Sequence, residues 1–374
     1  MIPDHIIAAI EDLGACTSAR AVLDLIEARL QKVKRERRGA KVSRAGAGTI
    51  LAFDQDPQSS RSGPDALAIL VKIPGDMDAA MRDTMHVHDD RVSGRGISKL
   101  FIVATLLDWL DTIVENHMVS ALRLAFYEWH DRSIAAMDQF AAVFPIDHAL
   151  AWFLEPTGML ACPAEKGFGK FTVSIAPGKG TDATGLPRAE IIAKLAAAIA
   201  GRFKPSHPVY PLDPANRLSF RFLPGAQIAT PVIAASQNEL HVTFSHHPLA
   251  DQFKQEVAEF INTTGAKLGT GTTLRVKTDY HFPGAKFSVA VPKFQQFIAT
   301  HKQLSGKEPY LEWHVNPSMA SVVYKHHPAA SGVVFGPGDP FVPGDDQDAI
   351  TAKDADDSRE FLETLGSNLL FKVS

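Results

Sequence analysis

The stretch "ALAWFLEPTGMLACPAEKGFGKFTVSIA", from Ala149 to Ala176, contains the point at which the order of structural elements changes. Its first six residues form a short continuous apolar run, which is typical of a strand buried on both faces of a parallel sheet. From Phe168 the strand "FGKFTVSIA" begins a different order of elements. We therefore expect two domains that meet within this stretch, as the length of 374 residues also favours.

The residues before this stretch alternate short apolar runs with helical segments. Helices are expected at about residues 18–38, after Ser98 and at about residues 131–144. Such alternation predicts an α/β fold with a mainly parallel sheet covered on both faces. The expected strands are "GTILAFD" from Gly48, "ALAILVKI" from Ala66, "ALRLAFY" from Ala121 and "ALAWFL" from Ala149.

The residues after Phe168 predict an inserted α+β domain. Their order is a strand, the helix "PRAEIIAKLAAAIAGRF", the strands "RLSFRFL" and "ELHVTFS", the helix "PLADQFKQEVAEFINTT" and the strand "TTLRVKT". This βαββαβ order is that of the split ferredoxin-like unit. Later residues return to the first pattern, with a helix near 292–303, the strand "SGVVFGPG" and a helix at 355–365. We expect an α/β domain of residues 1–167 and 279–374, interrupted by an insert of residues 168–278.

Composition limits the classes of partner. The formal net charge of -4 provides no basic field, which argues against nucleic acid or a membrane surface as the main partner. Cys16 and Cys162 are far apart in the sequence and form no disulfide or zinc-binding pattern. No apolar run approaches the roughly 18 residues of a membrane span, and the N-terminus lacks the pattern of a signal peptide. We expect a cytoplasmic protein that binds a small molecule.

Acidic residues follow four of the expected parallel strands. Ligands of open α/β sheets bind beyond the carboxyl ends of the strands, so these acids predict a shared cleft. A lysine, Lys99, stands in the first turn of the helix after "GRGIS", where the helix dipole favours an anion and where Ser98 is expected to be the cap. Lys99 either faces water or is surrounded by anions. The polar residues after the strands are Asp76, Asp78, His130, Asp131, Glu155 and Asp339.

Several motifs, taken in order, resemble the zinc-dependent aminoacylase and carboxypeptidase G family, which includes acetylornithine deacetylase and succinyl-diaminopimelate desuccinylase. The motifs are "SGRGIS", "LAFYEWHDRS", "LEPTGMLACPAEKGFGKFTVSIAPGKG", the βαββαβ insert and "VVFGPGD", across about residues 60 to 374. The resemblance implies an α/β metallopeptidase domain with a lid insert through which many members dimerise. It also implies two zinc ions in the interdomain cleft and hydrolysis of N-acyl amino acids or peptides by a zinc-bound water that a glutamate activates.

The residues that the resemblance assigns to the metal site are largely replaced. Asp76 stands for a histidine ligand and Lys99 for the aspartate that bridges both metals. Glu155 keeps its identity as a ligand, and Asp78 keeps the second acid of its motif. No histidine occurs from Pro328 to the C-terminus, where the last histidine ligand is expected near Gly344. The remaining replacements are His130 and Asp131 for the paired glutamates, and Asp182 near the catalytic histidine of the insert.

Three hypotheses follow from these replacements. In the first, the protein is non-catalytic or has chemistry that no longer needs metal ions, and it holds a small acyl-amino-acid or peptide-like ligand. Lys99 then replaces the metal charge among Asp76, Asp131 and Glu155. In the second, those three acids hold one metal and His130 is the base of an active hydrolase, although oxygen ligands suit magnesium, calcium or manganese better than zinc. In the third, the chain is a structural partner of an active paralogue.

Two further predictions concern the ligand and the assembly. "NPSMAS" at Asn316–Ser321 corresponds to the substrate-binding segment of the family, so Ser318 is expected to contact the ligand, although the arginine of that segment is missing. The free strand edges of the insert predict a homodimer through Phe168 to Thr278. The expected catalytic residues are Lys99, His130 and Asp131, and the expected ligand-binding residues are Asp76, Asp78, Glu155, Asp182 and Ser318.

Overall fold

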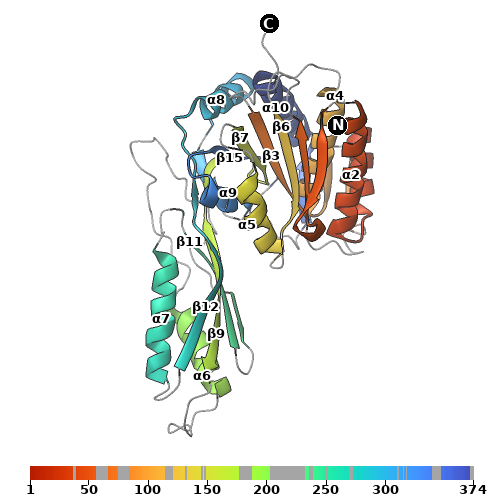
Figure 1. Cartoon of the computed structure of the whole chain (residues 1–374). Helices are drawn as coiled ribbons and strands as arrows, with labels where there is room; N and C mark the ends of the chain where they lie inside the picture. The colour runs from red at the N-terminus through yellow and green to blue at the C-terminus, as the bar shows by residue number, and fades with distance from the viewer. Residues whose placement is uncertain are drawn as a thin grey trace. The chain divides into compact units, whose positions relative to one another are not determined.

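The computed structural model divides the chain into two compact units (Figure 1). Unit 1 comprises Met1–Ala164 and Lys286–Ser374, and unit 2 comprises Glu165–Ala285. The sequence placed the corresponding boundaries at residues 167/168 and 278/279. The structure describes residues 1–374 except 37–38, 56–65, 75–83, 89, 114–120, 131–132, 145, 147–148, 177–187, 203–231, 236–238, 247, 249–251, 269–272, 310, 315, 317, 339–346 and 371–374.

Unit 1 is built around a large mixed sheet of strand order β1-β2-β6-β3-β7-β15-β8-β13, with β14 paired to β8. The central strands β6, β3, β7 and β15 are parallel, and the pairs β1–β2, β2–β6 and β15–β8 are antiparallel. This arrangement confirms the predicted α/β class. The strands are β1 (Lys41–Ala45), β2 (Ile50–Gln55), β3 (Ala66–Ile73), β6 (Leu122–Glu128), β7 (Ala149–Leu154), β8 (Ala161–Glu165), β13 (Ala285–Lys286), β14 (Leu311–His314) and β15 (Ser331–Val334).

Helices cover both faces of this sheet. Leu150, Trp152 and Leu154 of β7 belong to the core that includes α4, α8 and α10, whereas Phe153 stacks on Phe287, which contacts Tyr324 of α9. Helix α4 is apolar on nearly all sides, as expected for a helix buried between neighbours. The helices are α1 (Asp4–Gly14), α2 (Ala19–Glu36), α4 (Ile97–Ile113), α5 (Ile134–Val143), α8 (Pro292–Ser305), α9 (Met319–His326) and α10 (Ala352–Leu370), with a short 3-10 turn at Gly46–Gly48.

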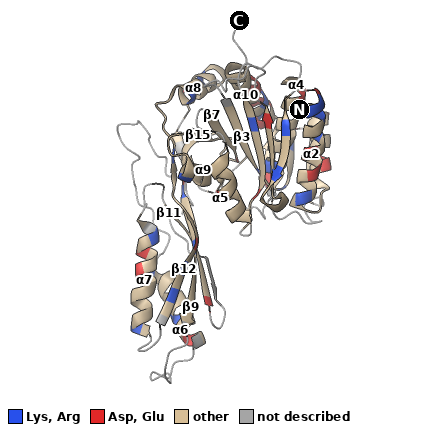
Figure 2. Cartoon of the chain, viewed as in Figure 1, with Lys and Arg blue, Asp and Glu red and all other residues tan. Residues whose placement is uncertain are grey.

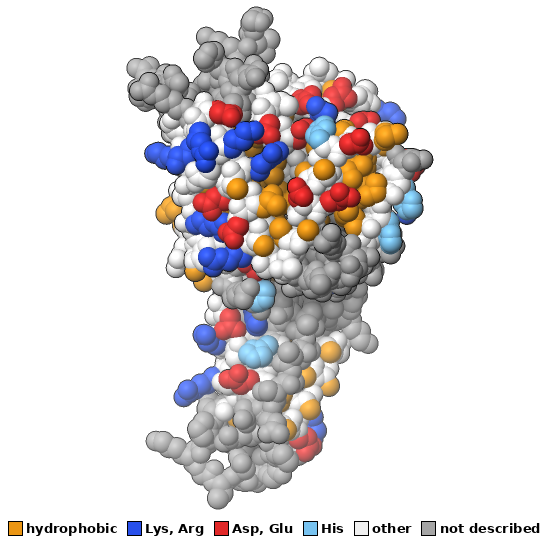
Figure 3. All heavy atoms as spheres, turned by 90° about the vertical axis from the view of Figure 1, so that its right-hand side faces the viewer, with side chains coloured by type: hydrophobic (Ala, Val, Ile, Leu, Met, Phe, Trp, Pro, Cys, Tyr) orange, Lys and Arg blue, Asp and Glu red, His pale blue; other side chains and the backbone are white. Residues whose placement is uncertain are grey.

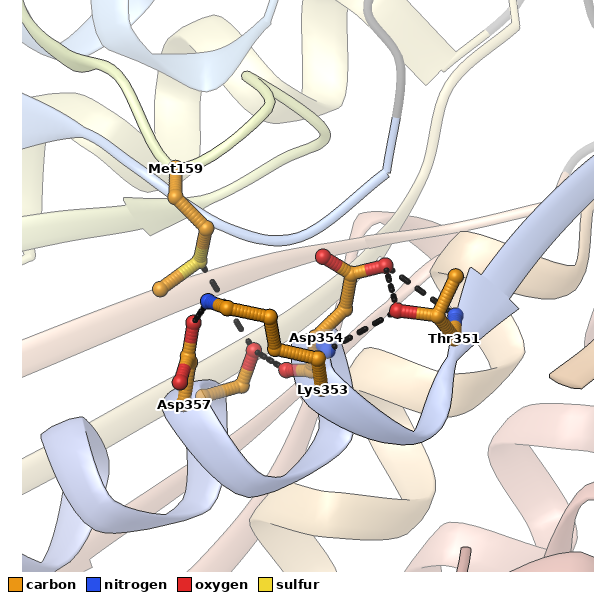
Figure 4. A network of polar contacts seen from close by, with 6 residues as sticks. Met159, Thr351, Lys353, Asp354 and Asp357 are labelled. Atoms are coloured by element: carbon orange, nitrogen blue, oxygen red, sulfur yellow. Dashed lines mark hydrogen bonds and ion pairs between the residues drawn. The ribbon is translucent and has the colours of Figure 1, made fainter. Parts of the chain in front are cut away.

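A small antiparallel sheet of order β16-β5-β4 leads into two of these helices. Its strands are β4 (His86–His88), β5 (Arg91–Arg95) and β16 (Gln347–Thr351); β5 precedes α4, and β16 precedes α10. Thr351 and Asp354 cap the start of α10 reciprocally (Figure 4). The Asp354 amide donates to Thr351 Oγ1 at 3.2 Å, and the Thr351 amide donates to Asp354 Oδ2 at 3.0 Å. This cap fixes the C-terminal end of β16.

Unit 2 has an antiparallel sheet of order β10-β11-β9-β12, which is the ferredoxin-like order. Its elements follow one another as β9 (Gly167–Ala176), α6 (Arg188–Arg202), β10 (Val232–Ala235), β11 (Glu239–His246), α7 (Phe253–Leu268) and β12 (Thr273–Phe282). Helices α6 and α7 share a core with the sheet. The predicted strand "RLSFRFL" lies outside the described residues, and the second described strand of the unit is β10.

Charges of both signs are distributed over the described surface. Lys and Arg as well as Asp and Glu occur along α2 and α7 in Figure 2, and the face turned to the viewer in Figure 3 also carries both signs. Among the described helices, none has the length and apolar character needed to cross a membrane.

Candidate functional site

Two loops that follow adjacent parallel strands are joined by hydrogen bonds. The loop after β7 contains Glu155 and Thr157, and the loop after β15 contains Gly336 and Gly338. The Thr157 amide donates to the Gly336 carbonyl at 3.1 Å, and the Gly158 amide donates to the Gly338 carbonyl at 2.7 Å. A Cβ on Gly336 would approach the Glu155 carbonyl oxygen to 2.7 Å, so only glycine permits this contact. The "EPTG" and "GPG" motifs therefore form one structure at the carboxyl edge of the sheet.

Glu155 is buried at this edge and is held by a tyrosine that the sequence analysis did not single out. Glu155 is only 2% exposed, and the hydroxyl of Tyr127 donates to its Oε1 at 2.9 Å. The same hydroxyl accepts a hydrogen bond from the Met319 amide at 3.2 Å, at the start of α9. Tyr127 thus connects the retained acid of "EPTG" to the "NPSMAS" segment.

The start of α4 is capped by a carboxylate from β16. Helix α4 begins at Ile97, after Gly96 with a left-handed φ of 66°, so Ser98 lies inside the first turn. The prediction that Ser98 is the cap is therefore wrong. The Ser98 amide instead donates to Asp348 Oδ2 at 2.8 Å. Asp348 lies opposite Gly94 in the β16–β5 pair, which places its carboxylate beside the turn that begins the helix.

Lys99 is half-buried next to this carboxylate, and its positive charge acts on Asp348. Burial raises the pKa of Asp348, whereas hydrogen bonds from Ser98 and Ala349 and the charge of Lys99 oppose the rise. The acid that the helix start favours is thus provided by a residue 250 positions away in the sequence. The predicted acids around Lys99 did not include Asp348. Of those predicted, Asp76 and Asp131 lie outside the described residues.

His130 and Ser318 occupy different environments. The side chain of His130 is exposed, and its amide donates to Ser133 Oγ at 3.0 Å in a tight turn after β6. Ser318 is fully buried, and its hydroxyl caps α9 by accepting from the Ala320 amide at 3.1 Å. The Ser318 hydroxyl thus caps its own helix, and a ligand-binding role for it stays a prediction.

The remaining predicted site residues lie outside the described part of the chain. They are Asp76, Asp78, Asp131 and Asp182, together with Asp339 and the position near Gly344. Tyr127 and Asp348 are the described site residues that the sequence analysis missed. Asp348 lies within the stretch "DPFVPGDDQD" in which the last metal ligand was expected. The many aspartates of that stretch were the only sign in the sequence that one of them belongs to the site.

A narrow apolar pocket lies beside these loops, on the face of the sheet that α4 and α10 cover. It encloses about 320 Å³, part of it open to solvent, and is lined by Trp152 and Leu154 of β7, by Phe101 of α4 and by Leu362 of α10. Met159, which has a φ of 60°, also lines it, and the Ser358 hydroxyl contacts the Met159 sulfur at 3.7 Å (Figure 4). The pocket adds apolar surface to the edge that carries Glu155.

The described residues do not fit a two-zinc centre. A protonated lysine cannot coordinate a metal, and Lys99 stands where the resemblance places the bridging carboxylate. Within the described ranges, no three His, Cys, Asp or Glu side chains gather in a group that could hold a metal ion. The donor chemistry at Lys99 therefore disagrees with the metal centre that the resemblance implies.

No family model matches the sequence, and no curated protein matches it either. Solved structures match the fold over nearly the whole chain. The dipeptidase Dug1p from Saccharomyces cerevisiae has 9% identity and a TM-score of 0.67, covering 97% of this chain and 94% of that one. The M20 family metallo-carboxypeptidase Sso-CP2 from Sulfolobus solfataricus has 13% identity and a TM-score of 0.63, covering 97% and 98%.

A third similar structure is the YXEP protein of Bacillus subtilis, a dinuclear metal-binding peptidase from the M20 family. It has 11% identity and a TM-score of 0.59, and the match covers 98% of each chain. Because these identities are low, the likeness establishes the fold alone. The chain has the fold of the M20 metallopeptidases, which agrees with the fold that the sequence motifs implied.

Proposed function

We propose that this protein binds a small N-acyl-amino-acid or peptide-like ligand beside Glu155 and Lys99 and does not carry out two-zinc hydrolysis. The observation that supports the proposal is the start of α4, where Lys99 lies beside the buried carboxylate of Asp348. The charge of Lys99, which acts on the Asp348 carboxylate, supplies fixed charge where the resemblance implies metal ions. Asp76, Asp78, Asp131 and Ser318 complete the proposed ligand site in unit 1, and a ligand-binding role for Asp182 in the insert stays a prediction.

The proposed roles follow from the charge of each group. Lys99 is half-buried and offers a cation to the carboxylate of an amino-acid-like ligand. Glu155 is held rigidly by Tyr127 and offers an acceptor to an amide N–H. The small apolar pocket beside Met159 adds apolar surface next to the proposed ligand site. His130 is exposed, as a base in direct contact with substrate would need to be, so it is the residue to test for residual hydrolysis.

The proposal is tested by metal content and ligand binding measured on the same preparation. We expect less than about half a zinc per chain, because a resident zinc normally has three or four protein ligands. N-acetyl amino acids and dipeptides are then titrated calorimetrically against the wild type and Lys99→Met. We expect binding that Lys99→Met weakens at least tenfold, since a charge-assisted contact contributes about 1.5 to 3 kcal/mol.

The matched control is Lys325→Met, which removes a lysine that pairs with Asp138 on the surface, with Nζ 2.9 Å from Oδ1. It should leave binding unchanged. Close to two zinc ions per chain, together with dipeptide hydrolysis, would return the protein to ordinary metallopeptidase chemistry. Hydrolysis that requires one manganese and is lost in His130→Ala would instead support the single-metal hypothesis.

We also propose a homodimer through the insert, and the sheet of unit 2 supports this. Strand β12 lies at one end of the described order β10-β11-β9-β12, and it runs for ten residues. A long strand edge is usually covered by another chain or element. Light scattering at micromolar concentration should give the mass of two chains. A monomer at that concentration would exclude this assembly, and with it a structural role as a homodimer.

A further inference from the structure

Two histidines face each other at one end of the sheet of unit 2. His246 is the last residue of β11, and His281 lies next to the last residue of β12. Their Nε2 atoms are 3.2 Å apart, and their ring centroids are 5.4 Å apart with an interplanar angle of 25°. The centroid separation exceeds the nitrogen separation by about the radii of two rings, so the two nitrogens point toward each other. His246 has no exposed surface.

Strand glycines provide the space for this arrangement. In the sheet, His246 lies opposite Gly167, and His281 lies opposite Gly169. A Cβ on Gly167 would overlap the imidazole of His246, and a Cβ on Gly169 would press against the ring of Phe244. Glycine inside a strand is unfavourable and often marks the close approach of another group. The two glycines of "GFG", Gly167 and Gly169, thus leave space for the rings of Phe244, His246 and His281.

A β-bulge directs His281 toward His246. Val276 pairs with Val173 and Thr278 with Phe171, so these β12 residues share the face that packs on the helices. The register then shifts between Thr278 and Tyr280. Without the shift Tyr280 would lie opposite Gly169, and with it His281 takes that place. Bulges commonly redirect a side chain in this way.

Charged side chains also occur on the elements that surround the histidine pair. Some of them form ion pairs, and others are exposed. Asp279 at the bulge accepts from Thr172 Oγ1 at 2.6 Å and pairs with Lys277 at 3.2 Å. On α6, Lys194 pairs with Glu190 at 2.8 Å. Glu165 and Lys166 precede Gly167 in the chain, and burial lowers the pKa of Lys166 to about 8. Lys170 follows Gly169, and Glu256, Glu259 and Lys267 of α7 are exposed.

We propose that His246 and His281 share one proton in an N–H···N hydrogen bond and form a pH-sensitive lock on the strand ends of unit 2. One imidazole donates its Nε2–H to the bare Nε2 of the other, so the two rings adopt opposite tautomers. One added proton is accommodated, because an imidazolium can still donate to a neutral ring. A second added proton leaves both nitrogens as donors and two like charges in a buried place, so the rings separate.

Separation of the two rings would change the structure near the first and last residues of unit 2. Gly167 begins β9, and His281 lies close to Ala285, the last residue of the unit. Separation of the rings removes the contact between the ends of β11 and β12. We therefore expect these strand ends to loosen in the second protonation step, at a lower pH than the first, because burial and the existing positive charge both disfavour the second proton. This inference does not depend on the proposed ligand.

The test is NMR of the intact protein labelled with ¹⁵N-histidine, recorded from pH 8 to pH 5. At pH 8 the two rings should show opposite tautomers, and on acidification the pair should take up one proton before a separate second step. Signals are assigned with His246→Gln and His281→Gln. Identical tautomers, or two independent titrations near 6.5, would overturn the proposal without requiring any variant to fold.

Backbone hydrogen exchange provides the second measurement. Corrected for intrinsic rates, exchange in residues 239–246 and 273–282 of the wild type should rise by about tenfold per pH unit during the second protonation, as expected for one linked proton. His281→Gln should lack this step. His241→Gln, a substitution at another β11 histidine, should retain it. Stoichiometric zinc binding that shifts both rings would show a metal site and overturn the shared-proton proposal.

Discussion

The carboxyl edge of unit 1 and the end of the sheet in unit 2 both bury ionisable side chains, but they stabilise them differently. Asp348 is held by the Ser98 amide and lies within the field of Lys99, so its partners keep the same protonation state at every physiological pH. His246 and His281 instead lie against each other, and an imidazole is a partner that can itself gain a proton. The comparison teaches that burial and the chemistry of the partner together decide how a buried group responds to pH.

The two regions should therefore respond to acid in opposite directions. Burial raises the pKa of Asp348, so protonation removes a buried charge and favours the folded state. The histidine pair accommodates one added proton and resists the second, so acid favours the unfolded state, which takes up both. Substitutions in each region test this contrast.

The largest effect is expected for Asp348→Ala. The variant leaves the amides of Ser98 and Ala349 without their carboxylate acceptor and leaves Lys99 without its neighbouring anion. A buried unsatisfied donor costs about 1 to 3 kcal/mol, so we expect a loss of about 3 kcal/mol of unfolding free energy in urea titrations. Asp348→Asn keeps an acceptor oxygen and should lose less than half as much. Equal losses would show that charge, and not hydrogen bonding, dominates.

A smaller effect is expected for Gly167→Ala in unit 2. The added methyl group overlaps the His246 ring and must displace it, which typically costs about 1 to 3 kcal/mol in a packed interior. Urea titrations should show this loss at pH 8, and the acid-dependent loosening of the strand ends should disappear. Gly201→Ala near the end of α6 is the control, because a Cβ there has open space. Unchanged histidine tautomers in Gly167→Ala would contradict the close contact.

The smallest effect is expected for Lys99→Ala. Because Lys99 is half-buried and its charge only partly opposes the rise in the pKa of Asp348, its removal should cost about 1 kcal/mol or less. Its removal should raise the pKa of Asp348 further. Because a raised carboxyl pKa penalises the folded state above that pKa, the loss should be present at neutral pH and diminish as the pH falls toward about 4. Thermal melts across pH measure this trend, and a loss that is independent of pH would exclude Asp348 as the partner.

Local sequence patterns predicted the elements that are apolar and long. The runs at Ala66, Ala121 and Ala149 are the strands β3, β6 and β7, and "SGVV" is β15. The polar strands β5 and β16, "RVSGR" and "QDAIT", lack such a pattern, because they belong to a small sheet with little apolar surface. Helix α10 begins at Ala352, before the expected Ala355, because the cap formed by Thr351 and Asp354 was not recognised.

The candidate site was predicted where motifs themselves carry the groups and missed where distant segments meet. Glu155 and Lys99 stand in recognisable loops. Tyr127 looked like a core residue of an apolar strand, and only tertiary structure places its hydroxyl between Glu155 and Met319. Asp348 looked like one acid among several in "DPFVPGDDQD". Its role depends on pairing between β16 and β5, and local sequence contains no information on such a pairing.

The position of β15 between β7 and β8 has a consequence for the order of folding. The strands β7 and β8 are synthesised early, but they are held apart by a strand that is made about 170 residues later, a separation that makes the pairing slow to find. During synthesis, all residues of the insert therefore emerge before β15, so the insert is complete while the sheet of unit 1 still lacks that strand. We expect unit 2 to acquire protection first on the ribosome, with the loops around Glu155 and Gly336 among the last parts to become ordered.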